Sequence, residues 1–219
     1  MKVIGVSGSP IKNSTTDRAV QMVLAATEAH KTEFFKLSDY TVSPCNGCLE
    51  CITTNRCVIE DDGVMLAEKA FKADVLVIGG YTSYSSLDSR TKAFIERLYP
   101  LQHRYGLMAG KLGAAVVTCA IPPDQAGLPS ACANGLQAIR DYIQLAGMEW
   151  VGGIPIVGNM PCVHCGEVQC QQSGLKMVYD SDATLASVGV RSLEDDPDKI
   201  AVLEKLGADI TARYYSNWR

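Results

Sequence analysis

The chain has 219 residues, of which 47% are hydrophobic and 20% charged, and its formal net charge is -4 at pH 7. This composition is typical of an ordinary soluble globular protein, and we expect one domain spanning residues 1–219. The mild acidity argues against nucleic acid or an anionic membrane as a partner, and no apolar run reaches the roughly 20 residues that cross a bilayer.

The first part of the chain alternates predicted strands and helices. A β-rich run from Lys2 to Val6 leads through a glycine and serine loop to a helix from Ser14 to about His30, where apolar residues recur at helical spacing. Thr32 to Leu37 predicts a second strand. Asp61 and Asp62 supply N-cap chemistry for a helix through Phe71. The continuously apolar segment Asp74 to Gly80 is typical of a buried parallel strand.

The same alternation continues after residue 80. Ser89 to about Leu101 predicts a helix, Leu112 to Thr118 a buried strand, and Ala131 to Ala146 a helix that Gly147 closes. Met148 to Val157 supplies a fifth strand. The sequence therefore predicts a doubly wound α/β fold with a five-stranded parallel sheet in the flavodoxin-like order 2-1-3-4-5.

Two segments lack helical or strand periodicity. The first is a cysteine-rich loop at residues 43–60, and the second runs from about 158 to 197 and is rich in Gly, Ser and Gln. We interpret the second segment as a cysteine-containing insertion on the domain, followed by a last helix at about 198–215. The N-terminus shows no apolar segment with a small-residue cleavage site, so we expect a cytoplasmic protein.

The loop after the first strand has the composition of an anion site. Gly5 to Thr16 contains glycines and ends in hydroxyl residues where a helix begins, so backbone N–H groups and the helix dipole can hold a phosphate. Lys12 is followed by Asn13, which is not the Walker pattern, and no third glycine completes a dinucleotide fingerprint. A serine-rich N-cap without a ligand is the structural alternative.

Two motifs give this loop a family resemblance. Gly8-Ser9-Pro10 followed by Lys12-Asn13-Ser14 resembles the phosphate loop of the NADPH-dependent FMN reductase family. Ala73 to Gly79, then a loop and Lys92 to Arg97, is similar to that family's third strand and following helix. The likeness covers roughly Met1 to Val157 and implies bound FMN. Where the family usually has Pro, Tyr and Gly in the ring loop, this chain has Tyr81, Ser83 and Ser85.

The resemblance implies three groups of FMN-binding residues. Those expected at the phosphate are Ser9, Asn13, Ser14, Thr15 and Thr16. Those expected along the isoalloxazine ring are Thr82, Ser83, Tyr84, Ser85 and Ser86, although Tyr84 could instead be a surface aromatic. Those expected at the ring's other edge are Thr118, Cys119 and Ala120, the last two replacing paired glycines of the family.

The chain has nine cysteines, and four of them form one compact motif. A reducing compartment makes metal or redox roles more common than a disulfide framework. Closely spaced thiolates are typical of iron–sulfur ligation. The spacing resembles that of the iron–sulfur flavoproteins, a branch of the same superfamily, which implies one [4Fe-4S] cluster on the four thiols. Structural zinc and unligated thiols are the alternatives. The four residues are Cys45, Cys48, Cys51 and Cys57.

A second group of cysteines lies in the insertion. Cys162, Cys165 and Cys170 surround His164, and a zinc site, a second cluster or an unmetallated loop with reactive thiols all fit this pattern. Cys132 fits a buried helix position better than a ligand position.

These features together predict an FMN-dependent oxidoreductase that passes electrons between FMN and a [4Fe-4S] cluster. We expect a small-molecule or protein redox partner, NAD(P)H as a candidate donor, and a homodimer or homotetramer, the last implied by the resemblance. A cluster-free NAD(P)H-dependent FMN or quinone reductase is one alternative. A non-enzymatic thiol or metal redox sensor is the other.

Overall fold

The computed structural model describes residues 1–123, 127–165, 170 and 172–217. Five parallel strands form the sheet in the spatial order β2-β1-β3-β5-β6, and a two-residue strand, β4, pairs antiparallel with β3. Setting β4 aside, this confirms the predicted flavodoxin-like order. The strands are β1 (Lys2–Ser7), β2 (Lys31–Lys36), β3 (Val75–Ser83), β4 (Ser86–Leu87), β5 (Leu112–Cys119) and β6 (Glu149–Val157).

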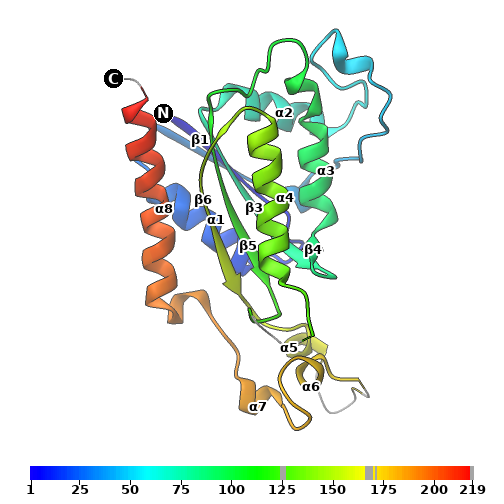
Figure 1. Ribbon diagram of the computed structural model, residues 1–219, viewed down its shortest axis with the longest axis vertical. Coiled ribbons are helices and arrows are strands. Elements are labelled where there is room, and N and C mark those ends of the chain that lie inside the picture. The colour runs from blue at the N-terminus through cyan, green and yellow to red at the C-terminus, as the bar shows by residue number, and fades with distance from the viewer. Residues whose placement is uncertain (124–126, 166–169, 171, 218–219) are drawn as a thin grey trace.

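Helices cover both faces of the sheet, as Figure 1 shows. α1 (Thr15–Ala25) and α8 (Pro197–Ser216) pack on one face, where their apolar side chains share a core with β1, β3, β5 and β6. α2 (Asp62–Lys72), α3 (Ser89–Arg97) and α4 (Ala131–Leu145) pack on the other. None of the helices among the described residues has the length and apolar character needed to cross a membrane.

Two helices end earlier than the sequence predicts. α1 ends at Ala25 instead of about His30, because the chain turns at Thr27 and the His30 N–H donates to Met1 O at 3.1 Å to start β2 beside β1. α3 ends at Arg97 instead of Leu101 and continues as a 3-10 helix at Tyr99–Gln102. Pro100 in this segment has no N–H to continue an α-helix.

The insertion contains short helices that the sequence analysis did not predict. They are α5 (Cys162–Cys165), α6 (Gly174–Val178) and α7 (Leu185–Val188). Cys162, Leu175 and Ala183 form a small buried cluster of their own. In Figure 1 these helices lie beyond the carboxyl ends of the strands, below the main sheet.

The cysteine-rich loop is fastened to α3 by a buried ion pair. Arg97 Nη1 donates to Asp61 Oδ2 at 2.8 Å and to Ser43 O at 3.0 Å, and Arg97 Nη2 donates to Ile59 O at 2.9 Å. The side chains of Arg97 and Asp61 are 1% and 8% exposed. Burial raises the pKa of Asp61, but hydrogen bonds from Arg97, Ser43 and Gly63 outweigh it and hold this pKa at about 2. One pair therefore anchors both ends of the loop.

We predict that Asp61→Asn lowers the free energy of unfolding by about 3–5 kcal/mol, because Arg97 would stay buried without a counter-charge. The folded pKa of Asp61 lies below its ordinary value of 3.8, so its contribution is present above that pH and is lost as pH falls towards about 2. Urea denaturation across this range measures both effects. The exposed Asp39→Asn variant is the control, and equal acid dependence in Asp61→Asn and the wild type would contradict the prediction.

Candidate functional site

The loop between β1 and α1 presents unpaired backbone donors at a helix start. Ser14 is the N-cap: its Oγ accepts from Asp17 N at 3.1 Å, while the Asp17 carboxylate accepts from Ser14 N at 3.1 Å. Asn13 before it has φ +51°. The N–H groups of Thr15 and Thr16 open the first turn, where no intrahelical acceptor exists. They are available to an anion.

A lysine from the neighbouring strand holds this loop from below. Lys36 Nζ donates to Ser9 O at 2.8 Å, to Ile11 O at 2.7 Å and to Asp17 Oδ2 at 2.6 Å. Its side chain is only 12% exposed, and Ser7 Oγ donates to the other oxygen of Asp17. The sequence analysis missed Lys36 because nothing in a strand pattern indicates which loop a side chain will enter. The loop is therefore folded before any ligand arrives.

A close backbone approach joins this loop to β3 and α3. Gly8 N donates to Gly79 O at 3.0 Å, and a side chain at Gly8 would overlap Thr91 Oγ1 and the Asp88 carboxylate. Asp88 is 1% exposed and accepts from Tyr81 N at 3.1 Å, Thr91 N at 2.9 Å and Thr91 Oγ1 at 2.7 Å. Only glycine therefore fits at position 8, because Thr91 and Asp88 leave no room for a Cβ atom.

The predicted ring loop is a tight β-hairpin. Thr82 pairs with Leu87 and Ser83 with Ser86, so Tyr84 and Ser85 form the two-residue turn. Both have positive φ, +50° and +58°, as a type I′ turn demands, although neither is glycine. Non-glycine residues in this conformation are uncommon and often mark functional loops. The Tyr84 side chain at the tip is fully exposed.

The end of β5 meets both of these loops. Thr118 Oγ1 lies 2.8 Å from Thr16 Oγ1, and Ala120 is half-buried beyond it. Asn134 on α4 donates from Nδ2 to Ser85 O at 3.0 Å, which steadies the hairpin turn. The residues predicted for the phosphate and for both ring edges therefore surround one edge of the sheet. It lies at the carboxyl ends of β1, β3 and β5, where open α/β sheets bind ligands.

Two cysteines form a disulfide that the sequence analysis did not expect. Cys119, predicted at the ring edge, is bonded to Cys132 on α4, and their Cα atoms are 5.5 Å apart. The expectation that Cys132 is buried in a helix is confirmed, since it is 8% exposed. The preference for metal or redox roles over a disulfide framework did not predict this bond. The β5–α4 connection brings the two residues together because β5 ends where α4 begins.

The four cysteines of the cysteine-rich loop line one small pocket of about 20 Å³ with Arg97. Burial raises the pKa of the Cys51 thiol, and its three cysteine neighbours raise it further. Cys45 and Cys48 are exposed and Cys57 is half-buried. Across the part of the chain that the structure describes, no three His, Cys, Asp or Glu side chains are spaced for a single metal ion.

The cysteines of the insertion differ from one another in burial. Cys162 is buried in the small cluster with Leu175, whereas Cys165 and Cys170 are exposed. Residues 166–169, which lie within this motif, are outside the described residues. A metal at this motif stays a sequence-based hypothesis.

Comparisons with known proteins identify the fold and the family. The family model described as NADPH-dependent FMN reductase matches residues 1–129, more than half of the chain. Solved structures of an NADH:FMN oxidoreductase and of an archaeal flavodoxin align over 97% of this chain and 89% and 98% of theirs. Their TM-scores are 0.57 and 0.51 at 15% and 14% identity. At that identity the structures show the flavodoxin-like fold alone.

Curated relatives place the chain more narrowly. An iron–sulfur flavoprotein of Methanocaldococcus jannaschii is 34% identical over 173 residues, which is 76% of this chain and 81% of the relative. One of Archaeoglobus fulgidus is 26% identical over 209 residues, 93% of this chain and 98% of the relative. We conclude that the chain belongs to the NADPH-dependent FMN reductase family, in its iron–sulfur flavoprotein branch, and is an FMN-dependent oxidoreductase.

Proposed function

We propose that the chain transfers electrons between FMN, held at the carboxyl edge of the sheet, and a [4Fe-4S] cluster held by the cysteine-rich loop. One observation carries the proposal. The unpaired first-turn donors of α1, the β3–β4 hairpin and the end of β5 converge on one edge, with a glycine where backbone must approach closely. NAD(P)H is the proposed donor, and a small molecule or a redox protein is the acceptor.

The phosphate site fits a mononucleotide. The N–H groups of Thr15 and Thr16 and the Ser14 hydroxyl lie together at the start of α1, where the helix dipole favours one phosphate. The loop has no dinucleotide fingerprint for a second phosphate group. FMN thus fits this loop better than FAD.

The chain's own residues would orient the cofactor. The flavin, when bound, supplies two-electron acceptance and one-electron release. The Tyr84 turn and the Thr118 to Ala120 segment would border the ring on two sides, and the Asn134 bond to Ser85 O joins the turn to α4. These residues position the ring, and the electron chemistry itself belongs to the cofactor.

The cysteine-rich loop fits a cluster by the chemistry of its donors. Four thiols share one pocket, and thiolates are the ordinary ligands of iron–sulfur clusters. The Arg97 guanidinium beside Cys57 would offset part of the negative charge that ligating thiolates carry. The relatives named iron–sulfur flavoproteins support this assignment. A cluster-free reductase remains the second candidate, and the test below separates the two.

The two proposed sites lie at opposite ends of α3. Asp88 caps its start beside the ring loop, and Arg97 at its end contacts the cysteine-rich loop. A nine-residue helix separates them by about 13 Å. Leu49, Ile52 and Val58 around the cysteine-rich loop are exposed apolar side chains that a second copy would cover. We therefore propose a homodimer or homotetramer in which one subunit's cluster faces another subunit's flavin.

The phosphate site can be tested at Ser14 without removing the helix cap. Asp and Asn both cap helices as well as Ser, but only Asp places negative charge against the phosphate. Ser14→Asp should weaken FMN binding about 100-fold or more, measured by quenching of flavin fluorescence. Ser14→Asn should bind within a few-fold of the wild type, and both variants should keep the wild-type melting temperature. If the Asp variant still bound stoichiometric FMN, the assignment of the phosphate to this loop would be wrong.

The cluster can be tested at Cys48. Protein purified without oxygen should contain about four iron and four sulfide per chain, and Cys48→Ser should lose most of both while keeping its flavin absorbance. The exposed Cys165→Ser variant is the matched control and should keep its iron. Wild-type protein with FMN but no iron or sulfide would leave the cluster-free reductase as the function. If only Cys165→Ser lost iron, the metal site would be assigned to the insertion instead.

A further inference from the structure

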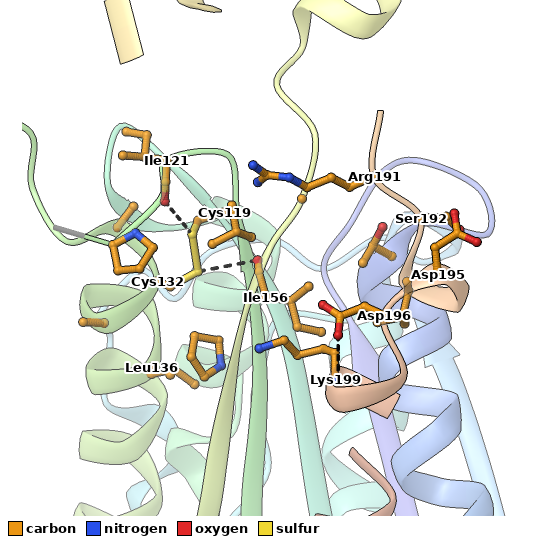
Figure 2. Close-up of a pocket in the computed structure, with 18 of the residues that line it drawn as sticks. Cys119, Ile121, Cys132, Leu136, Ile156, Arg191, Ser192, Asp195, Asp196 and Lys199 are labelled. Atoms are coloured by element: carbon orange, nitrogen blue, oxygen red, sulfur yellow. Dashed lines mark hydrogen bonds between the residues drawn. A yellow bond between two sulfur atoms is a disulfide. The ribbon is translucent and has the colours of Figure 1, made fainter. Parts of the chain in front are cut away.

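A cavity of about 780 Å³ lies at the carboxyl ends of β5 and β6 (Figure 2). The first turns of α4 form one side of it. The other side is formed by residues 190–199, which lead from the insertion into the first turn of α8. We call this segment the strap. The volume is in the range of small-molecule sites. Thr15 from the phosphate loop also lines the cavity, so it adjoins the proposed flavin position.

The Cys119–Cys132 disulfide forms part of the cavity wall, as the yellow bond in Figure 2 shows. The two residues are 6% and 8% exposed, and both line the cavity. Cys119 Sγ lies 3.3 Å from Ile121 O, where the chain turns away from β5. A small molecule in the cavity would contact the disulfide directly.

The same disulfide is adjacent to every loop proposed to hold FMN. Cys119 follows Thr118, whose hydroxyl contacts Thr16 of the phosphate loop at 2.8 Å. Cys132 is two residues from Asn134, which donates to the ring-loop carbonyl of Ser85. Gly135 packs so closely on the ring loop that a Cβ there would lie 3.1 Å from the Thr82 methyl carbon. The disulfide thus lies between the cavity and the ring edge.

The remaining cysteines bear on what kind of disulfide this is. Seven cysteines are free in the described structure, and four of these line one pocket. Thiols gathered in this way persist in a reducing environment, where disulfides, when present, are usually catalytic or redox-sensing. In such a compartment a redox-active role for Cys119–Cys132 is favoured over a purely structural one.

We propose that Cys119–Cys132 is a redox-active disulfide that takes an electron pair from reduced FMN and passes it to a small acidic disulfide bound in the cavity. The inference rests on the proposed FMN site. In the first step the Cys119–Cys132 S–S bond breaks. The two sulfur atoms take up two electrons from the reduced flavin together with two protons, and both become thiols. In the second step the two thiols reduce the substrate's S–S bond by thiol–disulfide exchange, which re-forms the Cys119–Cys132 bond and releases two substrate thiols.

The strap supplies the charge that selects such a substrate. Figure 2 shows the Arg191 and Lys199 side chains extending from the strap towards the wall that carries the disulfide. Asp195 and Asp196 also line the cavity, so its four charged side chains sum to zero. The Asp196 carboxylate accepts from Lys199 N at 2.9 Å at the start of α8, and Arg191 Nη2 donates to the Tyr179 hydroxyl at 3.2 Å. Because the two cations extend towards the disulfide wall, a substrate whose S–S bond lies against that wall would place its carboxylates beside them.

The first step is tested by mapping the disulfide in the anaerobic holoprotein before and after reduction of the flavin with dithionite. Samples are quenched in acid, alkylated and digested, and the peptide pair linked through Cys119 and Cys132 is quantified by mass spectrometry. We expect the linked pair to fall about tenfold or more on reduction of the holoprotein and to persist in flavin-free protein given the same dithionite. The wild type should also take up two electrons more per chain than Cys132→Ser, whereas Cys165→Ser should match the wild type.

Each outcome of this experiment bears on a separate claim. A linked pair that survives while the flavin absorbance is bleached overturns the inference and leaves the proposed FMN site intact. Oxidised protein without a linked pair also overturns it. Protein that binds no flavin overturns the proposed function, and the inference with it.

The substrate class is tested by reoxidising the reduced protein with oxidised glutathione, which is acidic, or with cystamine, a cationic disulfide. Re-formation of the linked pair should be faster with glutathione, and Arg191→Gln should slow that reaction about tenfold while leaving the cystamine reaction unchanged. Equal rates with both disulfides, or no effect of Arg191→Gln, would overturn the assignment of an acidic disulfide as substrate.

Discussion

The candidate flavin site depends on one buried carboxylate, that of Asp88. It is 1% exposed and accepts from Tyr81 N, Thr91 N and Thr91 Oγ1. These bonds join the end of β3 to the start of α3, and Gly8 packs directly against the group they form. Because a buried acceptor is costly when unpaired, the three donors fix the geometry strongly. The spacing between the phosphate loop and the ring loop follows from this cluster.

A second buried carboxylate organises the other end of α3. Asp61 and Arg97 hold both ends of the cysteine-rich loop, as Asp88 holds the start of the helix. The same nine-residue helix thus carries an anchored loop at each end, and the two sites are separated by a rigid element. This arrangement places the two proposed sites about 13 Å apart within one subunit.

The fold was largely predictable because its strands are continuous apolar runs and its helices carry recognisable caps. The runs at β3 and β5 are buried on both faces, and Ser14, Asp61 and Asp88 cap helices as their residue types indicate. The end of α1 was not predictable, because helical spacing continues past Ala25 while the pairing of β2 with β1 requires a turn there. The short helices of the insertion were not predicted for a similar reason, since they depend on a small tertiary cluster around Leu175.

The candidate site was predictable only where a local motif marks it. The phosphate loop and the four-cysteine motif are contiguous in sequence, so composition and spacing indicate them. Lys36 and Asn134 lie far from those loops in sequence, and only the strand order and the packing of α4 bring them in. These residues hold the loops in position, which is a tertiary property.

The cysteines also show that spacing along the sequence does not predict every tertiary contact. Spacing groups Cys45 with Cys48 and Cys162 with Cys165, yet Cys119 and Cys132, which belong to no motif, are the bonded pair. The pair forms because a strand that ends at residue 119 and a helix that starts at residue 131 must meet at the sheet edge. That edge is where the proposed flavin and the cavity also lie. Position relative to the sheet, more than spacing along the chain, therefore decides which sulfur atoms lie beside the proposed flavin site.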